Sequence, residues 1–405
     1  MAQTPDFALD HQIRLLQGTQ EFFPALIEAM DVALADIQFE TYIFDFTDSG
    51  AKVAEALMRA AQRGVRVHLV VDGVGTGRLP QIWADRLHAA GVRVRVYSPL
   101  GPLGLLLPQR WRRLHRKMCV VDGHLLFCGG INVLDDFHDP NHGVLTAPRL
   151  DFAVVVTGSL VVSASDAMEQ LWWRMQAVRD VRQRHLPKAL QSLRAAGAAQ
   201  HAAVASNHRN GIRAALLLRD NVRNRTRIEK AYRRAIGTAR EEIIIANAYF
   251  LPGGKLRRAL VMAARRGVRV RLLLQGRYEY FMQYHAARPV YGALLRAGIE
   301  IHEYEPSFLH AKVAVIDALG ARPWATVGSS NLDPLSLLLA REANVVVEDA
   351  AFATELRARL EHAMQHEGRG LDPARYANRT WRERVLDRVA FVLMRLALWL
   401  SGSRY

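Results

Sequence analysis

The chain has 405 residues, half of them hydrophobic, and it carries a formal net charge of +15 with a sequence pI of about 10.3. This length suits two domains of ordinary size or one large duplicated unit, and the apolar content supports a substantial core. The basic balance favours an anionic partner, either nucleic acid or an acidic membrane surface, and two cysteines are too few for a secreted-type disulfide framework.

The two ends of the chain carry no sign of a targeting or spanning segment. Residues 1–10 lack a basic region followed by an apolar run, so we expect no signal peptide. A spanning helix needs ~20 clean apolar residues. The nearest candidate, residues 385–400, is interrupted by Asp387, Arg388 and Arg395.

The first half of the sequence reads as helices alternating with strands. In chain order we expect a helix over 22–35, a strand over 39–44, a helix from 56 to Gly64, a period-two strand after it, a further strand after Gly91, and a hairpin of 118–121 with 125–128. Cys119 and Cys128 should face each other across this hairpin as buried, reduced thiols.

The second half repeats this order. Residues 56–73 match 259–276, and 90–94 match 297–301. We expect a helix over 226–238, a strand over 243–250, a helix from 259 to Gly267, strands after Gly267 and Gly298, and a hairpin of 313–316 with 324–327. Strands that alternate with helices imply an α/β sandwich in each half.

The repeats divide the chain into four parts. These are an N-terminal lobe over 10–175, a basic helical connector over 176–210, a C-terminal lobe over 211–365, and a tail over 366–405 with an amphipathic membrane-surface helix. The expected fold class is α/β, with two pseudo-symmetric α/β/α sandwich lobes that share one active site at their interface.

One chemical motif, H-x-K-x-x-x-x-D, occurs once in each half. The candidate catalytic residues are His115, Lys117 and Asp122 in the first copy and His310, Lys312 and Asp317 in the second. Each copy is followed by small residues and an asparagine, and these supply the candidate phosphate-binding residues Asn132, Asn331, Ser329 and Ser330. The first copy has two glycines where the second has its serines, so only the second half offers hydroxyls there.

These residue types fit covalent phosphoryl chemistry without a metal. A neutral imidazole can attack an anionic phosphodiester that would repel an oxyanion, and a second histidine can protonate the leaving alkoxide. The lysines can neutralise the phosphoryl oxygens, and the asparagines can donate further hydrogen bonds. Two histidines are needed on opposite sides of one phosphorus, and a duplication can deliver them.

The histidines also need acidic partners that fix their tautomers. The motif aspartates lie at hairpin turns and look better placed for a structural role. Asp151 and Glu342 each open a strand-like run after their motif and are the better candidates. We expect Asp151 to pair with His115 and Glu342 to pair with His310.

Two apolar segments bear on the substrate. Residues 100–108 form an apolar loop that leads towards His115, and 381–400 reads as a helix with Arg384, Arg388 and Arg395 within roughly 40° of one another. Both could enter a membrane interface. The alternatives are that the loop belongs to the core and that the tail packs on the body.

The two motifs resemble those of the phospholipase D superfamily and, within it, the bacterial cardiolipin synthases of the B type. The likeness covers about residues 10–365 and rests on segments 21–24, 113–117, 129–132, 245–250, 326–336 and 342–344. It implies a phosphatidyl-histidine intermediate and the joining of two phosphatidylglycerols into cardiolipin and glycerol, with phosphatidylethanolamine as another donor. It implies no cofactor, no metal and a peripheral position on the cytoplasmic side of the bacterial inner membrane.

Within this resemblance we assign His115 as the nucleophile and His310 as the acid and base. Three alternatives remain open: a phospholipid hydrolase, a nucleic-acid phosphodiesterase of the same superfamily, and a non-catalytic lipid-binding protein. The apolar loop and the tail argue against nucleic acid as partner, because a nucleic-acid groove favours exposed basic and aromatic residues. Two complete motifs argue against a non-catalytic role. The sequence does not fix the oligomeric state.

Overall fold

A computed structural model describes residues 6–101, 111–139, 142–198, 211–220, 224–277, 281–333 and 340–400. The chain forms two compact units. The N-terminal unit comprises Thr4–Asp135 and Ala153–Leu216, and the C-terminal unit comprises Asp136–Phe152 and Leu217–Tyr405. One segment of the first half, Asp136–Phe152, therefore belongs to the C-terminal unit.

The N-terminal unit is built around one sheet with strand order β4-β3-β2-β6-β7-β10-β1-β11. The neighbours β2, β3 and β4 are parallel, whereas β6, β7 and β10 follow as antiparallel strands. Its elements are β1 (Ala8–Gln17), α1 (Gly18–Asp31), β2 (Asp36–Thr41), α2 (Asp48–Gln62), β3 (Arg66–Asp72), α3 (Gln81–Ala89), β4 (Arg93–Tyr97), β5 (Arg113–Leu114), β6 (Met118–Val121), β7 (Leu125–Gly129), β10 (Phe152–Thr157), α4 (Leu160–Arg182), α5 (Leu186–Ala198) and β11 (Ile212–Arg219).

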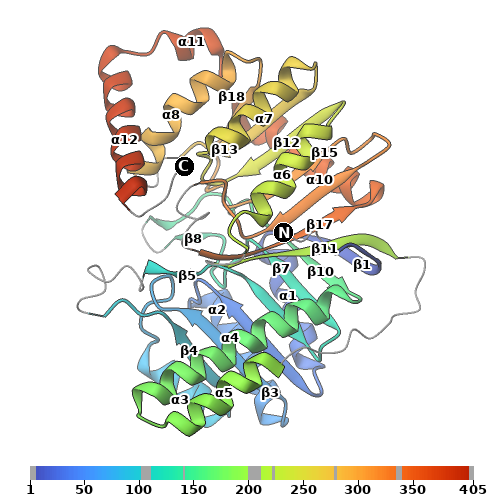
Figure 1. The fold of residues 1–405 in the computed structure, drawn as a ribbon, viewed down its shortest axis with the longest axis vertical. Coiled ribbons are helices and arrows are strands. Elements are labelled where there is room, and N and C mark those ends of the chain that lie inside the picture. The colour runs from blue at the N-terminus through green and yellow to red at the C-terminus, as the bar shows by residue number, and fades with distance from the viewer. Residues whose placement is uncertain are drawn as a thin grey trace. The chain divides into compact units, whose positions relative to one another are not determined.

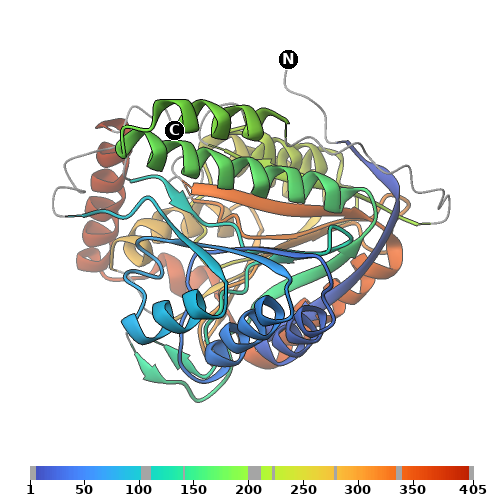
Figure 2. The ribbon, with the colours of Figure 1, turned by 90° about the horizontal axis from the view of Figure 1, so that it is seen from below.

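Helices cover both faces of this sheet. On one face, Leu69 of β3 packs in a large apolar core with residues of α1 and α2 such as Leu26 and Leu57. On the other face, Val70 packs against Trp172 of α4, because successive strand residues point to opposite faces. The helices α4 and α5 lie side by side as a hairpin (Figure 2), so the first residues of the expected connector form regular helix.

The C-terminal unit repeats this plan with strand order β18-β14-β13-β12-β15-β16-β17. Its elements are β8 (His138–Asp139), β9 (Gly143–Val144), α6 (Arg227–Thr238), β12 (Glu242–Asn247), α7 (Gly254–Arg265), β13 (Arg269–Gln275), α8 (Phe281–Leu295), β14 (Glu300–Tyr304), β15 (Lys312–Ile316), β16 (Trp324–Gly328), β17 (Ala340–Glu348), α10 (Ala350–His362), the π-helix η3 (Ala363–Glu367), β18 (Gly368–Gly370), α11 (Pro373–Ala377) and α12 (Trp381–Leu400).

The two units share one order of elements. In each, a helix precedes a parallel strand, a second helix ends at a glycine with φ near +90° (Gly64 and Gly267), and an antiparallel hairpin completes the sheet. In Figure 1, α6 and α7 lie over one face of the C-terminal sheet and α10 lies over the other. The expected α/β class with two pseudo-symmetric α/β/α sandwiches is confirmed for the units taken singly.

The motif aspartates anchor the far ends of their strands. The carboxylate of Asp122 accepts hydrogen bonds from the backbone N–H groups of Leu34, Ala35 and Asp36 at 2.7–2.9 Å. Asp317 does the same for the three residues that lead into β12, Arg240, Glu241 and Glu242. Both aspartates have φ near +50°, a conformation that aspartate tolerates in turns.

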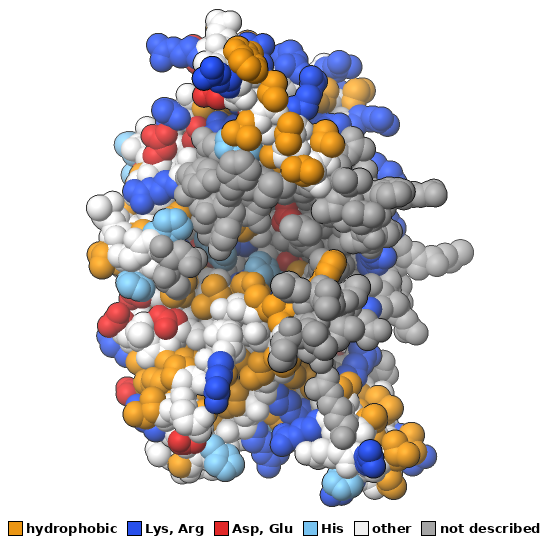
Figure 3. All heavy atoms as spheres, turned by 90° about the vertical axis from the view of Figure 1, so that its left-hand side faces the viewer, with side chains coloured by type: hydrophobic (Ala, Val, Ile, Leu, Met, Phe, Trp, Pro, Cys, Tyr) orange, Lys and Arg blue, Asp and Glu red, His pale blue; other side chains and the backbone are white. Residues whose placement is uncertain are grey.

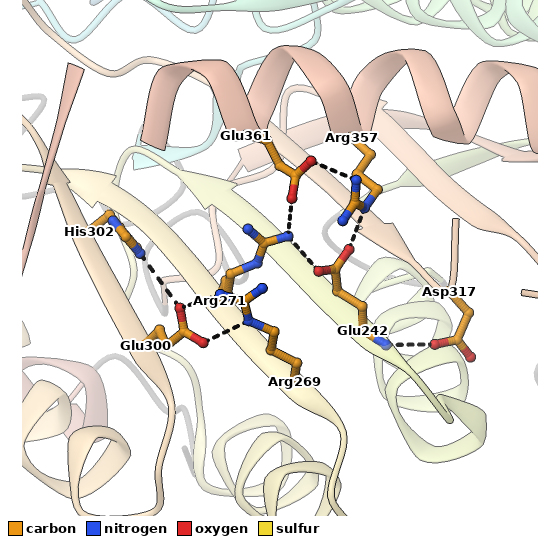
Figure 4. Close-up of polar contacts among 8 residues, drawn as sticks. All are labelled: Glu242, Arg269, Arg271, Glu300, His302, Asp317, Arg357 and Glu361. Carbon is orange, nitrogen blue, oxygen red and sulfur yellow. Dashed lines mark hydrogen bonds and ion pairs between the residues drawn. The ribbon is translucent and has the colours of Figure 1, made fainter. Parts of the chain in front are cut away.

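A cluster of ion pairs surrounds the Asp317 end of the C-terminal sheet (Figure 4). Arg271 of β13 bridges Glu242 of β12 and Glu361 of α10, and Arg357 contacts the same two carboxylates at 2.6 Å. Arg271 is buried, and each charge in this group faces an opposite one. The cluster therefore ties α10 to the end of the sheet that is remote from Lys312.

The cysteines are buried and reduced, as expected, but they do not face each other. The hairpin register pairs Cys119 with Phe127 and Met118 with Cys128. A difference of one residue turns a side chain to the other face of a sheet, so the two thiols point to opposite faces. Burial raises the pKa of both thiols, that of Cys128 to about 12.

The tail helix α12 packs against α8 within the C-terminal unit. Among the residues that the structure describes, no helix has the length and apolar character needed to cross a membrane. Most of the apolar loop expected over 100–108 lies outside the described residues, as do 199–210 of the expected connector, 334–336 of the serine-rich segment and the end of the tail, 401–405.

The three N–H bonds to Asp122 should make stability depend on acid pH. Burial alone would raise the pKa of this carboxyl, but the N–H donors lower it below its ordinary 3.8. A lowered pKa stabilises the folded state above pH 3.8, and this contribution is lost as the pH falls through the folded-state pKa. We expect Asp122→Ala to lower the free energy of unfolding by about 1–3 kcal/mol at neutral pH, with a difference from wild type that shrinks in acid.

Urea unfolding at several pH values measures this, with Asp31→Ala as the control. Asp31 pairs with Arg59 on the exposed surface of the same unit, at 2.9 Å, and such pairs contribute roughly 0–1 kcal/mol. An Asp122→Ala variant as stable as Asp31→Ala, or one whose deficit does not change with pH, would contradict the anchoring role.

Candidate active site

The polar motif residues of the C-terminal unit gather at one edge of its sheet because of the strand directions. Strand β12 ends there at Asn247, and β15 runs antiparallel to it and begins at Lys312, directly opposite Asn247. Strand β16 returns to the same edge and leads into 329–331, and β17 leaves it with Glu342 as its third residue. The Asp317 anchor lies at the other end of β15, about 17 Å away at ~3.3 Å per residue.

His310 is held by the segment of the first half that belongs to this unit. Its backbone N–H donates to the carbonyl oxygen of Leu150 at 2.9 Å, and the N–H of Leu150 donates to Phe308 at 3.0 Å. The N–H of Leu309 donates to the side-chain oxygen of Gln275 at 3.0 Å. The backbone around His310 is thus fixed from two sides, by residue 150 and by the end of β13.

The imidazole of His310 contacts Asp151, at 2.6 Å between Nδ1 and Oδ2. The other carboxylate oxygen accepts the N–H of Phe152 at 2.8 Å, so Asp151 is held on both sides. The carboxylate is buried, whereas 23% of the histidine side chain is exposed. Since an ionised carboxylate can only accept, Nδ1 of His310 donates to Asp151, and Nε2 is left as the ring atom that can exchange a proton.

This contact corrects the expected pairing. The sequence favoured Asp151 with His115 and Glu342 with His310, because each acid follows the nearer motif. In the structure the acid of the first half pairs with the histidine of the second. The reason is the parallel bridge between Leu150 and Leu309, a long-range contact that places the start of β10 beside the second motif.

Three residues that the sequence analysis missed hold the 136–152 segment in shape. The carboxylate of Asp139 contacts Arg149 at 2.6 Å and the ring of His142 at 3.0 Å. Arg149 also donates to the carbonyl oxygen of His138, and the ring of His142 lies 4.9 Å from that of Phe308. The sequence offers one signal for this group, namely that Arg149 lies two residues before the candidate acid Asp151.

Lys312 is fully buried at the start of β15. Its Nζ donates to the carbonyl oxygen of His310, which folds the side chain back over the motif. The neighbouring Asn247 is also buried and accepts the N–H of Leu332 at 3.1 Å. Its side-chain nitrogen has no hydrogen-bond partner among the described residues. Asn247 therefore presents a buried donor beside the lysine, although the sequence did not single it out as a site residue.

The serine pair after β16 serves partly to hold Glu342. The hydroxyl of Ser329 donates to the Glu342 carboxylate at 2.5 Å and accepts the N–H of Ala343 at 3.0 Å. Ser330 donates to the backbone oxygen of Asn331 at 3.4 Å, and all of these residues are buried. Glu342 is thus a positioned carboxylate at the same edge as His310.

The N-terminal unit builds the same edge around the first motif. Lys117 is buried, and its Nζ donates to the carbonyl oxygen of His115 at 2.9 Å, as the second lysine does to its own histidine. Arg116 points to the other face, where it forms a buried ion pair with Glu40 at 2.8 Å. Alternate residues of an extended chain point to the same face, so His115 and Lys117 share the face opposite Arg116, and both lie near the ring of Tyr42. Asn132 accepts the N–H of Ile43 at 3.2 Å, which ties the end of the hairpin to the end of β2.

Tyr42 is a residue of this edge that the sequence analysis did not select. Its ring lies 4.8 Å from the imidazole of His115, edge to face, and 5.4 Å from Nζ of Lys117. Phe44 and Phe250 make equivalent bridges, so the counterpart of Tyr42 in the second half is Ala248. The two motifs therefore differ in an aromatic wall as well as in the serine hydroxyls.

Comparison with known proteins places this arrangement in a family. A family model described as "Cardiolipin synthase, PLD-like domain" matches residues 26–146 and 232–364, so it matches both halves. The chain is 36% identical over 397 residues to the cardiolipin synthase B of Escherichia coli K12, which covers 97% of this chain and 91% of that protein. The cardiolipin synthase B of Salmonella typhi is 35% identical with the same coverage.

Among solved structures, the chain resembles the phosphatidylserine synthase of Haemophilus influenzae with a TM-score of 0.66. The match covers 96% of this chain and 95% of that one, and at 12% identity it concerns the fold alone. The family model and the full-length relatives agree with the double motif and with the repeated α/β unit. The chain belongs to the cardiolipin synthase family, whose members carry phospholipase D-like domains.

Proposed function

We propose that the protein is a cardiolipin synthase that transfers a phosphatidyl group between two phosphatidylglycerol molecules. The observation that carries this proposal is the similarity of nearly the whole chain to cardiolipin synthase B proteins. The donor is phosphatidylglycerol, and phosphatidylethanolamine is a second donor of the same chemical class. The double motif and its surroundings supply the groups that this transfer needs.

The proposed reaction has two displacements at one phosphorus. Neutral His115 attacks the phosphorus of the first phosphatidylglycerol through Nε2. The bond to the headgroup glycerol oxygen breaks as His310, which begins this step as the imidazolium, donates its Nε2 proton to that oxygen. Glycerol leaves. His310 then takes the proton of a headgroup hydroxyl of the second phosphatidylglycerol, whose oxygen attacks phosphorus and breaks the P–N bond. Both histidines return to their starting forms.

The contact between Asp151 and His310 supports the acid and base role of His310. A carboxylate on Nδ1 fixes the tautomer with the lone pair on Nε2 and stabilises the imidazolium that forms when Nε2 takes a proton. A buried, hydrogen-bonded carboxylate gives this stabilisation without reorganisation. By the pseudo-symmetry of the repeat, we assign Glu342 the same task for His115.

The remaining polar residues stabilise the charge that develops on the phosphoryl oxygens. We assign this role to Lys117 and Lys312 as cations and to Asn132, Asn331 and Ser330 as hydrogen-bond donors. Ser329 positions Glu342. Asn247 joins this set, because its side-chain nitrogen is a buried donor beside Lys312. Asp122 and Asp317 act on the site indirectly, because they hold the register of the strands that carry the motifs.

We place the reaction at the cytoplasmic surface of the bacterial inner membrane, with the protein bound peripherally. The lipid substrate is anionic, and a net charge of +15 favours encounter with an anionic leaflet. No nucleic acid is expected as substrate.

We expect the purified protein, without added metal, to convert phosphatidylglycerol labelled in its headgroup into cardiolipin and free glycerol in equal amounts. Thin-layer chromatography of the lipids and an assay of released glycerol measure the two products. If phosphatidic acid forms in place of cardiolipin, the protein is a hydrolase and the acceptor is water. Cleavage of DNA with no turnover of lipid would support a nuclease.

We expect His115→Ala and His310→Ala each to abolish cardiolipin formation, because one displacement needs both groups. Acid-labile, base-stable phosphate should be trapped on His115 after a brief reaction with phosphorus-labelled lipid, and peptide mapping locates it. Label on His310 would reverse the two roles. Substantial synthesis by either variant would rule out a two-histidine mechanism.

We expect Asp151→Asn to lower kcat by about 10²-fold or more with little change in KM, because an amide does not stabilise the imidazolium of His310. The control is Asp349→Asn, the same change at the N-cap of α10, where asparagine caps as well as aspartate. Steady-state kinetics of wild type, Asp151→Asn and Asp349→Asn measure the effect on kcat and KM. Wild-type kcat in Asp151→Asn, or an equal loss in Asp349→Asn, would count against the assignment.

A further inference from the structure

The tail helix α12 is attached to the body by a buried polar contact. The carboxylate of Asp387 contacts Nδ1 of His285 in α8 and Nη1 of Arg379, which lies just before α12, each at 2.8 Å. Ala390, one turn further along the helix, is buried on the same face. A buried carboxylate with two directional partners fixes the rotation of the helix about its axis.

The start of the helix is fixed as well. Thr380 and Glu383 form a capping box, in which the glutamate accepts the N–H of Thr380 at 3.0 Å and the threonine accepts the N–H of Glu383 at 3.4 Å. Just before it, the guanidinium of Arg379 lies 3.8 Å from the ring of Tyr376, whose hydroxyl donates to the carbonyl oxygen of Arg288 in α8. The residues that leave the body at α12 therefore do so in one defined orientation.

The face that this orientation turns outwards is apolar. At 100° per residue its members fall within an arc of about 140°, opposite the face of Asp387 and Ala390. We call this set the α12 stripe, and it consists of Trp381, Val385, Leu386, Val389, Val392 and Leu393, which are 40–70% exposed. Figure 3 shows hydrophobic side chains gathered near the top of the face on which α12 lies, with Lys and Arg side chains around them.

Basic side chains accompany the α12 stripe. Arg384 and Arg388 are exposed and fall between the buried face and the edge of the stripe, whereas Arg382 falls within the arc of the stripe, in the first turn of the helix, 5.7 Å from the ring of Trp381. The one exposed acid in the described part of the helix, Glu383, is engaged in the capping box. The outward face is thus mainly apolar, with positive charge along one edge and in the first turn of the helix.

We propose that the α12 stripe is a membrane-docking surface that lies in the interface of an anionic phospholipid bilayer. The proposal rests on the proposed function in that the substrate is a bilayer lipid. Apolar side chains would enter the boundary between headgroups and acyl chains, and the arginines would contact lipid phosphates. The charge at the border favours anionic headgroups over a second copy of this basic chain, and the buried Asp387 keeps the other face on the protein.

The test is sedimentation with vesicles of phosphatidylcholine that contain phosphatidylserine, an anionic lipid that the proposed reaction does not consume. We expect Val389→Asp, near the middle of the α12 stripe, to lower the partition coefficient by about tenfold or more. The matched control is Leu319→Asp, which places the same charge at a 69% exposed apolar residue away from α12. It should bind as wild type does.

A second pair of variants tests the charged border. Arg384→Gln and Arg388→Gln should each lower binding to the anionic vesicles by roughly fivefold and leave binding to pure phosphatidylcholine unchanged. Added salt should reduce the difference from wild type, since it screens exposed charges.

Activity on a short-chain, monomeric phosphatidylglycerol separates this proposal from the proposed function. Val389→Asp should keep wild-type turnover of that soluble substrate and lose turnover of vesicle lipid. If wild-type protein makes cardiolipin yet Val389→Asp binds vesicles as tightly as Leu319→Asp, the docking surface is wrong and the function stands. If vesicle binding responds as expected but no cardiolipin forms, the function is wrong. A dimer in sedimentation equilibrium that Val389→Asp dissociates would assign the stripe to a second copy and overturn the proposal.

Discussion

The register of one short strand in each half decides where every motif residue lies. Strands β6 and β15 are four and five residues long, and the motif places a lysine before or at the start of each and an aspartate just after its end. The aspartate accepts three N–H groups from the residues at the start of the neighbouring antiparallel strand, so the two strands cannot slide past each other. A slip of one residue would turn the histidine and lysine to the opposite face. The spacing of the motif therefore matches the length of one strand, with the histidine and lysine at one end and the anchoring aspartate at the other.

The duplication is symmetric in backbone and asymmetric in side chains. Each lysine folds back onto the carbonyl oxygen of its own histidine, which shows that the local backbone is the same in both units. The surroundings differ. Tyr42 stands beside His115, whereas Ala248 occupies the matching position in the second half, and Ser329 holds the Glu342 carboxylate where the first half has a glycine. The differences in their neighbours give the two motifs different environments within one repeated frame.

The sequence was sufficient for features that depend on local periodicity. The repeat, the hairpins, the helix ends at Gly64 and Gly267, and the structural nature of Asp122 and Asp317 all follow from short-range spacing, and the structure agrees. It was insufficient where the outcome depends on a long-range contact. The bridge between Leu150 and Leu309 decides which histidine Asp151 contacts. Leu150 and Leu309 lie 159 positions apart in the sequence, and so do Asp151 and His310. The expectation that the two cysteines face each other was wrong for a local reason. The hairpin turn is centred on Gly123, so Cys119 pairs with Phe127, one position away from Cys128.

The segment Asp136–Phe152 limits how the two halves of this duplication can be separated. It is encoded in the first half, yet it packs in the C-terminal unit and brings the carboxylate that fixes the tautomer of His310. A protein cut between the two sequence repeats would separate His310 from Asp151. The same cut would separate residues 136–152 from residues 308–310, to which their backbone is hydrogen-bonded. The second repeat taken alone therefore lacks the carboxylate that contacts its histidine, because the structural unit and the sequence repeat do not coincide.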